Sequence, residues 1–548
     1  MTDYRKIIFE HIKGVLPELD VSDIQQSENF CDYCVPCFKY AKILRKAPAM
    51  IANEFAAKLT VPGVQVSALN GYLNFTIERA ERVKSVFERN EFLPLAGKTV
   101  CIDYSSVNIA KPFHIGHLMT TVIGGALYKI YKSLGANVVG INHLGDFGTQ
   151  FGGLISAYRR WGDEARLNER GLDELLELYV KFHNEEEKNP DLAAEARGWS
   201  KKIEEGDSYA VGLFDKFKSI TLEQAKKVYN RLNIEFDSYL GESFYVDKVS
   251  KVEDKLKAKG LLKLSDGAEI VDVGDDMPPA IIRRSDGASL YVARDLAAAY
   301  YRKDTYDFDK CLYVVASHQA LHFKQLFKVL ELMGEPWAND MVHVSYGMVS
   351  VEGMSLSTRK GNVLFLSDVL DAAVAKAASI INERNEKLDN KKEVSESVGV
   401  GAVVFDALYD GRLKDKNFSL DSALNFDGET GPYVQYTHAR CRSVLSKAGN
   451  ADIDGIDYDM LTGDSAYEVI KLLSDFDSVT LDAAIKYEPS FVSRRLVKIC
   501  QAFNRFYNAE KIMCGGAEQS ARLALTRAVA DTLKKGLSLV LLDAPERM

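Results

Sequence analysis

Four short apolar runs, separated by long helix-periodic stretches, restrict the fold of this sequence more than any other feature. The runs occupy residues 99–104, 137–141, 310–316 and 342–345. The stretches between them show the i, i+3, i+4 apolar spacing of amphipathic helices. Alternation of this kind is typical of an α/β fold, in which helices cover a parallel sheet and ligands bind at the carboxyl ends of the strands.

Residues 1–96 form a separate predicted unit, because their pattern differs from the alternation that follows. Apolar residues recur at helical spacing in residues 4–15 and 36–59. Short alternating segments at residues 64–66 and 72–76 are typical of strands. We therefore expect an N-terminal α+β domain in front of the parallel sheet.

The parallel sheet is expected within residues 97–426, which also carry one long insertion. Residues 161–230 are charged and helix-periodic, so they predict solvent-facing helices without chemistry of their own. In residues 427–548 the apolar residues recur at helical spacing alone, which predicts an all-α C-terminal domain.

Composition and charge exclude several classes of protein. The chain has 548 residues, of which 47% are hydrophobic and 27% charged, a balance typical of a globular protein of several domains. The net charge of −9 argues against a protein that coats DNA, because such binding needs a basic surface. The longest apolar runs are shorter than the roughly 18 residues of a membrane span, and residues 1–10 carry charges where a signal peptide is apolar. We expect a cytoplasmic protein with neither membrane nor DNA as a partner.

Three of the eight cysteines, Cys31, Cys34 and Cys37, lie close together in the sequence. Their spacing resembles part of a zinc site, but no fourth cysteine or histidine follows closely. Packing of a helix against the N-terminal sheet is the simpler interpretation. We expect reduced thiols and no structural metal.

The segment after the first apolar run has the features of a phosphate site. Residues 108–117 read Asn-Ile-Ala-Lys-Pro-Phe-His-Ile-Gly-His and open a helical pattern. His114 and His117 can share one face at a helix start, where backbone N–H groups and the helix dipole favour anions. Gly116 has no side chain, so a flat base can lie close to the backbone there. Two histidines on one helix face are also common as structural or metal-binding residues, so the motif needs support from elsewhere.

Such support comes from residues 357–361, which read Ser-Thr-Arg-Lys-Gly. Arg359 and Lys360 place two cations beside Gly361, in a loop able to close over a triphosphate. The two segments together predict an ATP site.

The two motifs, in this order, resemble the signatures of the class I aminoacyl-tRNA synthetases. Residues 105–114 and residues 142–152 are similar to the form that these regions take in arginyl-tRNA synthetases, and the similarity extends across nearly the whole chain. The resemblance implies a Rossmann-like catalytic domain. It also implies an N-terminal domain that contacts the outer corner of the tRNA and an anticodon-binding C-terminal domain.

The resemblance also implies the reaction, which is that of an arginine–tRNA ligase. L-arginine and ATP would form arginyl-adenylate and pyrophosphate, and the arginyl group would pass to the 2′-hydroxyl of the 3′-terminal adenosine of tRNA(Arg). Mg²⁺ would accompany the ATP, and activation would need bound tRNA, as is usual in the family.

An arginine pocket must offer acceptors around a planar group that has five donors and no acceptor. Tyr291 and Asp295 have the i, i+4 spacing that puts both on one face of a helix start. From the residues alone, a surface helix cap is the simpler explanation, and the resemblance reverses that preference. Carried over residue by residue, the family's arginine-binding positions are Asp103, Asn108, His117, Glu242, Tyr291, Asp295 and Gln319.

The basic loop departs from the general class I pattern Lys-Met-Ser-Lys-Ser. Aligned on Ser357, the two lysines of that pattern fall on Ser355 and Thr358. The missing charge must come from elsewhere, and Lys111, three residues before His114, is the nearest candidate. The predicted catalytic residues are Lys111, His114, His117, Arg359 and Lys360. The predicted ATP-binding residues are His114, Gly116, His117, Arg359, Lys360 and Gly361.

Basic residues near the C-terminus are candidates for tRNA contact, although each cluster suits a solvated helix face equally well. They are Arg440, Arg442, Arg494, Arg495, Lys498 and Arg505.

Three alternatives remain open from the sequence. Another class I synthetase would differ in its amino acid. A smaller nucleotidyltransferase with the same His-x-Gly-His turn is disfavoured by the chain length and the helical C-terminal part. A tRNA-binding paralogue without activity is suggested by the missing lysine pair, although Lys111, Arg359 and Lys360 argue against it.

Overall fold

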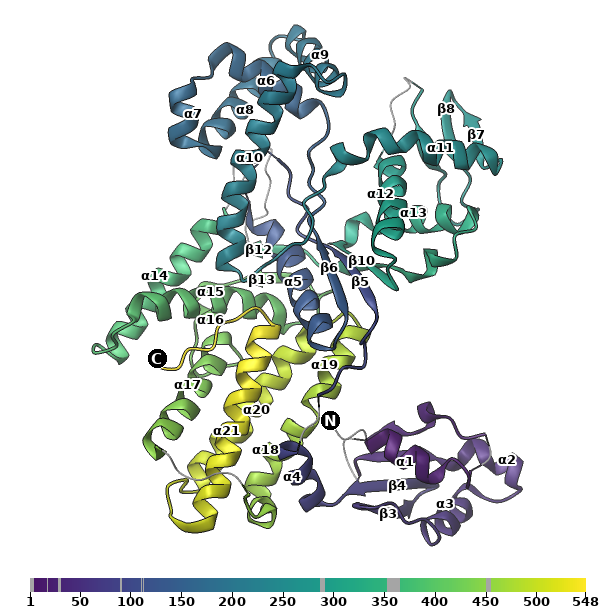
Figure 1. The fold of residues 1–548 in the computed structure, drawn as a ribbon, viewed down its shortest axis with the longest axis vertical. Helices are drawn as coiled ribbons and strands as arrows, with labels where there is room; N and C mark the ends of the chain where they lie inside the picture. The colour runs from purple at the N-terminus through teal and green to yellow at the C-terminus, as the bar shows by residue number, and fades with distance from the viewer. Residues whose placement is uncertain are drawn as a thin grey trace. The chain divides into compact units, whose positions relative to one another are not determined.

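The computed structural model describes the chain except for residues 1–3, 17, 28–30, 89–90, 110, 112, 286–290, 352–364 and 450–454. It divides into two compact units, each built from segments that are distant in the sequence (Figure 1). The first unit comprises Met1–Phe92, Arg440–Ser478 and Lys498–Leu533. The second comprises Leu93–Ala439, Val479–Val497 and Lys534–Met548.

The first unit contains an antiparallel sheet with the strand order β1-β2-β4-β3. Its strands are β1 (Gln25–Gln26), β2 (Tyr33–Pro36), β3 (Val64–Leu69) and β4 (Tyr72–Ile77). The helices that accompany the sheet are α1 (Tyr4–Ile12), α2 (Ala41–Leu44), α3 (Pro48–Ala56) and α4 (Arg79–Phe87). Ile8, Val35 and Phe75 are fully buried in the core between them, as is Cys37.

The single helix expected over residues 36–59 is wrong. Pro36 ends strand β2, and a 3-10 turn (Cys37–Tyr40) leads into two short helices, α2 and α3. Arg45 follows α2 with a φ of +49°, which a continuing right-handed helix cannot contain. Pro48 begins α3, because proline has no N–H to donate and is tolerated only in a first helical turn.

The second unit is built around a parallel sheet with the strand order β11-β10-β5-β6. The strands are β5 (Thr99–Asp103), β6 (Asn137–Ile141), β10 (Lys310–Ala316) and β11 (Met341–Tyr346). Consecutive residues of β5, from Val100 to Asp103, are buried, as expected for a strand covered on both faces. The predicted α/β core is confirmed.

Helix α5 (Leu118–Ser133) packs closely against this sheet and is buried along most of its length. Gly124 makes the close approach possible, because a Cβ there would lie 2.2 Å from the Cβ of Tyr104. The start of α5 is thereby fixed beside the carboxyl end of β5.

The other helices of the sheet region are α11 (Val249–Ala258), α12 (Tyr291–Tyr306), α13 (Ala320–Leu332), α14 (Leu366–Arg384), α15 (Lys391–Tyr409) and α16 (Leu420–Ala423). A small antiparallel sheet contains β7 (Leu262–Ser265), β8 (Ala268–Val271) and β9 (Ala280–Arg283), and β12 (Val349–Val351) pairs with β13 (Lys416–Phe418). Helices α12 and α13 contact each other (Figure 1). Leu296 of α12 and Leu326 of α13 are buried in a core that also contains residues of the sheet.

The predicted insertion is a bundle of five helices with a core of its own. They are α6 (Thr149–Trp161), α7 (Glu164–Arg170), α8 (Leu172–Glu186), α9 (Asp191–Glu204) and α10 (Ser208–Arg231). Phe151, Leu175 and Phe217 are among its buried residues. The bundle therefore begins earlier than residue 161, at the segment that follows β6.

The described residues of the C-terminal part of the chain form helices joined by turns and loops, with no strand among them, as predicted. The helices are α17 (Gly431–Ala448), α18 (Asp464–Ser474), α19 (Phe476–Ile485), α20 (Ser490–Ala509) and α21 (Gly516–Leu539). In the described parts of the chain, no helix is long and apolar enough to cross a membrane.

Candidate active site

The carboxyl ends of the parallel strands bring most of the predicted site residues to one edge of the sheet. Strand β5 ends at Asp103, β6 leads into His143, and β10 leads into Gln319. Residues at this edge are also tied together by a bridge between Asn108 and Gly145. Ligand sites of parallel sheets lie at this edge, so the topology favours the predicted location.

The His-Ile-Gly-His turn has a defined hydrogen-bond arrangement. His114 precedes a 3-10 turn (Ile115–His117), and its Nδ1 accepts the N–H of Gly116 at 3.1 Å. Nδ1 of His117 accepts the N–H of His114 at 3.3 Å, and the two ring centroids are 3.8 Å apart. Since Nδ1 is an acceptor in both rings, a neutral ring carries its hydrogen on Nε2.

Burial keeps both imidazoles neutral. It lowers the pKa of His114, and it lowers the pKa of His117 to about 3, with the positive charge of Lys111 acting in the same direction. The turn therefore presents two neutral N–H donors at physiological pH. Gly116 has a local role, because a Cβ there would lie 2.8 Å from the ring of His114.

Lys111 lies close enough to both histidines to affect their pKa values. Its Nζ is 5.7 Å from the centroid of the Tyr179 ring, on α8 of the helical insertion. Its contact with phosphate stays a prediction. Arg359, Lys360 and Gly361 lie outside the described residues.

A second group of predicted residues surrounds the start of α12. This helix begins at Tyr291, so Tyr291 and Asp295 lie one turn apart, as predicted. Glu242, at the start of a 3-10 segment (Glu242–Lys248), accepts a bond from Nε of Arg294 at 3.2 Å. The negative charge of Asp295 contributes to raising the pKa of Glu242, so the two carboxylates interact electrostatically.

The two carboxylates differ in protonation. Burial raises the pKa of Glu242 to about 7, although the neighbouring Arg294 opposes the rise. Burial acts against ionisation of Asp295 and is the largest single influence on it. The hydrogen bond from His322, together with the charges of His322, His143 and Arg302, outweighs burial, so the pKa of Asp295 lies below its usual value. Asp295 is thus ionised at pH 7, whereas Glu242 is poised between its two forms.

The guanidinium of Arg294 lies near two aromatic rings at the start of α12. Its Cζ is 4.6 Å from the ring centroid of Phe147 and 5.1 Å from that of Tyr291. Planar cations stack well on aromatic faces, and a carboxylate completes their coordination. The surroundings of Glu242 and Tyr291 therefore suit a guanidinium.

The remaining predicted arginine-binding residues have different environments. Asp103 is buried, and its Oδ2 accepts a bond from Nη2 of Arg302 at 2.7 Å. Asn108 and Gln319 are exposed at the sheet edge. Their contacts with a ligand stay predictions.

Sequence reasoning gave no role to three side chains that hold this group in place. Arg294 and Arg302 lie on buried faces of α12, and His322 of α13 bonds to Asp295. The sequence did contain a signal for Arg302, because it stands among the alanines and other apolar residues of one helix. A buried cation needs an acidic partner, so this position predicts an ion pair.

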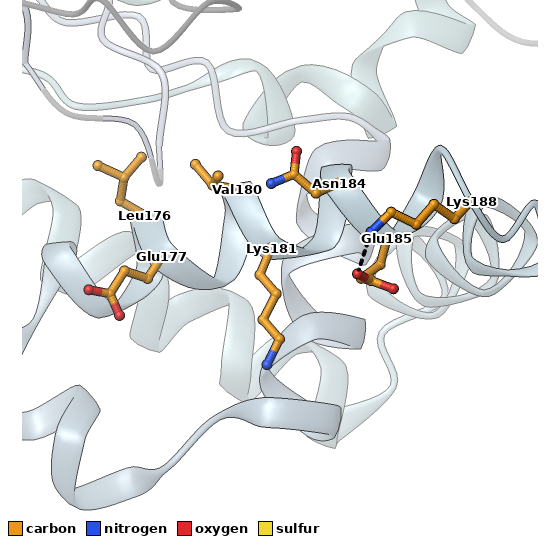
Figure 2. A pocket seen from close by; sticks show the side chains of 7 residues that line it. All are labelled: Leu176, Glu177, Val180, Lys181, Asn184, Glu185 and Lys188. Carbon is orange, nitrogen blue, oxygen red and sulfur yellow. Dashed lines mark hydrogen bonds and ion pairs between the residues drawn. The ribbon is translucent and has the colours of Figure 1, made fainter.

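A hollow of about 500 Å³ on α8 is unrelated to this edge of the sheet (Figure 2). It is lined by Leu176, Glu177, Val180, Lys181, Asn184, Glu185 and Lys188. Six of the seven come from α8 and Lys188 follows its end, and the hydrogen bond drawn there joins Lys188 to Glu185. Such a shallow surface contains none of the predicted site residues.

Known families match consecutive parts of the chain. The catalytic domain of class I tRNA synthetases (R) matches residues 88–420, and the arginyl tRNA synthetase N terminal domain matches residues 2–77. The DALR anticodon binding domain matches residues 434–548.

Individual relatives match over the full length. The arginine–tRNA ligases of Alkaliphilus metalliredigens and Clostridioides difficile are 48% and 47% identical, with 100% of this chain and of each relative covered. The solved arginyl-tRNA synthetase of Thermus thermophilus is 25% identical, with a TM-score of 0.87 over 100% of this chain and 99% of that one. That of Plasmodium falciparum, at 22% identity, has the same fold, with a TM-score of 0.84 over 100% and 98% of the two chains.

Proposed function

Because the chain belongs to the arginyl-tRNA synthetases of class I, we propose that the carboxyl edge of its parallel sheet carries out both steps of arginine–tRNA ligation. L-arginine and ATP give arginyl-adenylate and pyrophosphate, and the arginyl group then passes to the 3′-terminal adenosine of tRNA(Arg) with release of AMP. The family matches support this reaction over the full length of the chain.

In the first step, a carboxylate oxygen of arginine attacks the α-phosphorus of ATP. A new oxygen–phosphorus bond forms as the bond to the leaving pyrophosphate breaks, so the enzyme needs no nucleophile of its own. Its contribution is alignment and stabilisation of the charge that grows on the phosphates. Mg²⁺ enters on the ATP and shares that charge.

His114 and His117 supply neutral N–H donors to the phosphates at the start of α5. Their hydrogen-bond pattern supports this role, because both rings keep Nδ1 occupied and carry the hydrogen on Nε2. Lys111, Arg359 and Lys360 add positive charge, and Gly116 and Gly361 allow close approach of the backbone.

Asp295, together with Glu242, receives the guanidinium of the substrate, and Tyr291 forms one wall of the pocket. The single observation that carries this assignment is the position of Asp295 at the start of α12, one turn from Tyr291, with its half-buried carboxylate bonded to His322 through Oδ2. Asp103, Asn108, His117 and Gln319 complete the arginine site. The compact ammonium group of lysine cannot bond to two acceptor positions that are arranged for a planar guanidinium, so the site rejects lysine.

The N-terminal domain and the C-terminal helices contact the tRNA, and bound tRNA is needed for activation. The match of residues 434–548 to an anticodon-binding domain supports the C-terminal contact. The reaction takes place in the cytoplasm, where ATP, tRNA and reduced thiols occur together.

Charging of total tRNA with labelled arginine, with lysine as the control amino acid, tests the proposed function. We expect arginine to be attached and lysine to be discriminated against by about 10⁴ or more in kcat/KM. Lysine charged within about a hundredfold of arginine would refute the arginine pocket. Retention of tRNA on a filter without any charging would show a tRNA-binding protein that lacks the activity.

A further inference from the structure

Asp295 lies between two imidazoles that come from different elements. Nε2 of His322, on α13, is 2.6 Å from Oδ2 of Asp295. Nε2 of His143, which follows β6, is 3.9 Å from Oδ1 of the same carboxylate. Among the residues that the structure describes, Oδ1 accepts no hydrogen bond, so one oxygen is occupied and the other is not.

The hydrogen on each imidazole can be assigned from its neighbours. An ionised carboxylate can only accept, so Nε2 of His322 is the donor to Oδ2. Arg302 can only donate, and its Nη2 is 3.4 Å from Nδ1 of His143. Nδ1 of His143 is therefore the acceptor, and the neutral ring carries its hydrogen on Nε2, which points towards Asp295.

This chain of contacts is anchored in the sheet. Nη2 of Arg302 also donates to Asp103 at the end of β5, at 2.7 Å, and both side chains are almost fully buried. Nε2 of His143 is buried and has no hydrogen-bond partner within the described parts of the chain. A buried donor of this kind is costly unless a ligand or a small movement satisfies it.

We propose that His322 is a positioning residue for arginine recognition, which fixes the plane of the Asp295 carboxylate and leaves Oδ1 for the guanidinium of the substrate. This inference rests on the proposed function, in which Asp295 is the acceptor. Nε2 of His143 faces Oδ1 from the other side at 3.9 Å, in the tautomer that Arg302 imposes.

The geometry of guanidinium binding explains why such positioning matters. A guanidinium N–H bonds well to Oδ1 only when it approaches near the plane of the carboxylate, along a lone pair of that oxygen. An aspartate can rotate about its last side-chain bond, whose torsional preference is broad. A short bond from His322 to Oδ2 removes that freedom before the substrate arrives, so less ordering remains to be done on binding.

The test compares two substitutions of His322 by steady-state aminoacylation. His322→Ala removes the donor, whereas His322→Gln keeps an amide N–H near the position of Nε2. The matched control is His183→Gln on the surface of α8, which removes another histidine–carboxylate pair, with Glu186 at 3.2 Å. The KM for arginine, the KM for ATP, kcat and the thermal midpoint are measured for each variant.

We expect His322→Ala to raise the KM for arginine about tenfold or more, because a hydrogen bond to a charged group is lost. The KM for ATP and kcat should stay within about threefold of the parent, and His322→Gln should restore most of the arginine KM. His183→Gln should leave all four quantities unchanged.

Asp295→Asn separates failure of this inference from failure of the proposed function. If Asp295→Asn raises the KM for arginine and His322→Ala does not, the positioning role is overturned while the pocket stands. If neither substitution changes it, the assignment of Asp295 itself is overturned. If His322→Ala lowers the thermal midpoint and impairs the arginine KM, the ATP KM and kcat alike, the residue is merely structural and the inference fails.

Discussion

One ion pair at the edge of the parallel sheet and one on the surface of the helical insertion α6–α10 differ sharply in burial. At the sheet edge, the side chains of Arg302 and Asp103 pair with exposures of only 1% and 7%. In the insertion, Lys201 and Glu205 pair at 3.5 Å with exposures of 73% and 60%. Burial makes a charge expensive and fixes its position, whereas exposure leaves it hydrated and replaceable. The Arg302–Asp103 pair is therefore fixed beside the predicted site, whereas the Lys201–Glu205 pair belongs to the solvated surface of the insertion.

The most severe test of this comparison is Arg302→Met. Removing one member of a buried ion pair leaves Asp103 uncompensated, so we expect the free energy of unfolding to fall by about 3–5 kcal/mol. Denaturant titration followed by circular dichroism measures the change. In the control, Arg302→Met combined with Asp103→Asn, part of the loss should be recovered. A loss below about 1 kcal/mol would mean that the buried pair behaves like a surface pair.

The next effect in size concerns the neutral donors of the His-Ile-Gly-His turn. His117→Ala should lower kcat of arginine-dependent ATP–pyrophosphate exchange by about 10²–10³, the usual effect of losing one donor to developing charge. His117→Gln, which retains an N–H donor, should lose less. The exchange is measured with tRNA present, and a rate for His117→Ala within about fivefold of the parent would exclude this role.

The pH dependence of stability tests whether His117 is a neutral donor. Because burial lowers the pKa of His117 to about 3, its ring stays neutral in the native protein as pH falls from about 8 to 6. An unfolded chain would take up a proton in that range, near its ordinary pKa of about 6.5. His117 therefore contributes stability above pH 6.5 that is lost progressively as pH falls. Histidine NMR should show this ring unprotonated at pH 6, and a protonated ring would contradict the donor assignment.

A smaller effect is expected at Glu242. Burial raises its pKa to about 7, so about half of the molecules carry a neutral Glu242 at that pH. A bound guanidinium favours the ionised form, so arginine binding should release protons near pH 7, and the KM for arginine should fall as pH rises through this range. Titration calorimetry in two buffers of different ionisation enthalpy measures the release. Glu242→Gln should abolish it, and a release that persists in this variant would exclude Glu242 as its source.

The smallest effect is expected in the insertion. Lys201→Ala should leave both the thermal midpoint and kcat/KM unchanged within error, because exposed ion pairs contribute little to stability. A clear loss of charging activity in this variant would show that Lys201 has a functional role. It would contradict the view that this exposed pair only keeps the surface solvated. Differential scanning fluorimetry and the charging assay provide the two measurements.

The sequence predicted the sheet better than it predicted the pocket. The strands at residues 137–141 and 310–316 have the predicted bounds, because buried parallel strands produce strong local apolar runs. The helix expected over residues 36–59 failed, because Pro48 and the left-handed Arg45 interrupt an apolar pattern that looks continuous. The backbone preferences of single residues, and not the apolar periodicity, determine where the helices end here.

At the site, spacing could predict that Tyr291 and Asp295 share a helix face, because both belong to one element. It could not predict the chain of contacts from Asp103 through Arg302 and His143 to Asp295, because these residues meet only when β5, β6 and α12 are assembled. The protonation of Glu242 likewise depends on burial by distant segments.

The central claim, that Asp295 receives a planar cation at the sheet edge next to a bound nucleotide, is tested most directly by a crystal structure of the protein with L-arginine and a non-hydrolysable ATP analogue. We predict that the guanidinium will donate to the Asp295 carboxylate beside Tyr291, with the phosphates against the turn at His114 and His117. A guanidinium bound elsewhere, with Asp295 still held only by His322, would contradict the account.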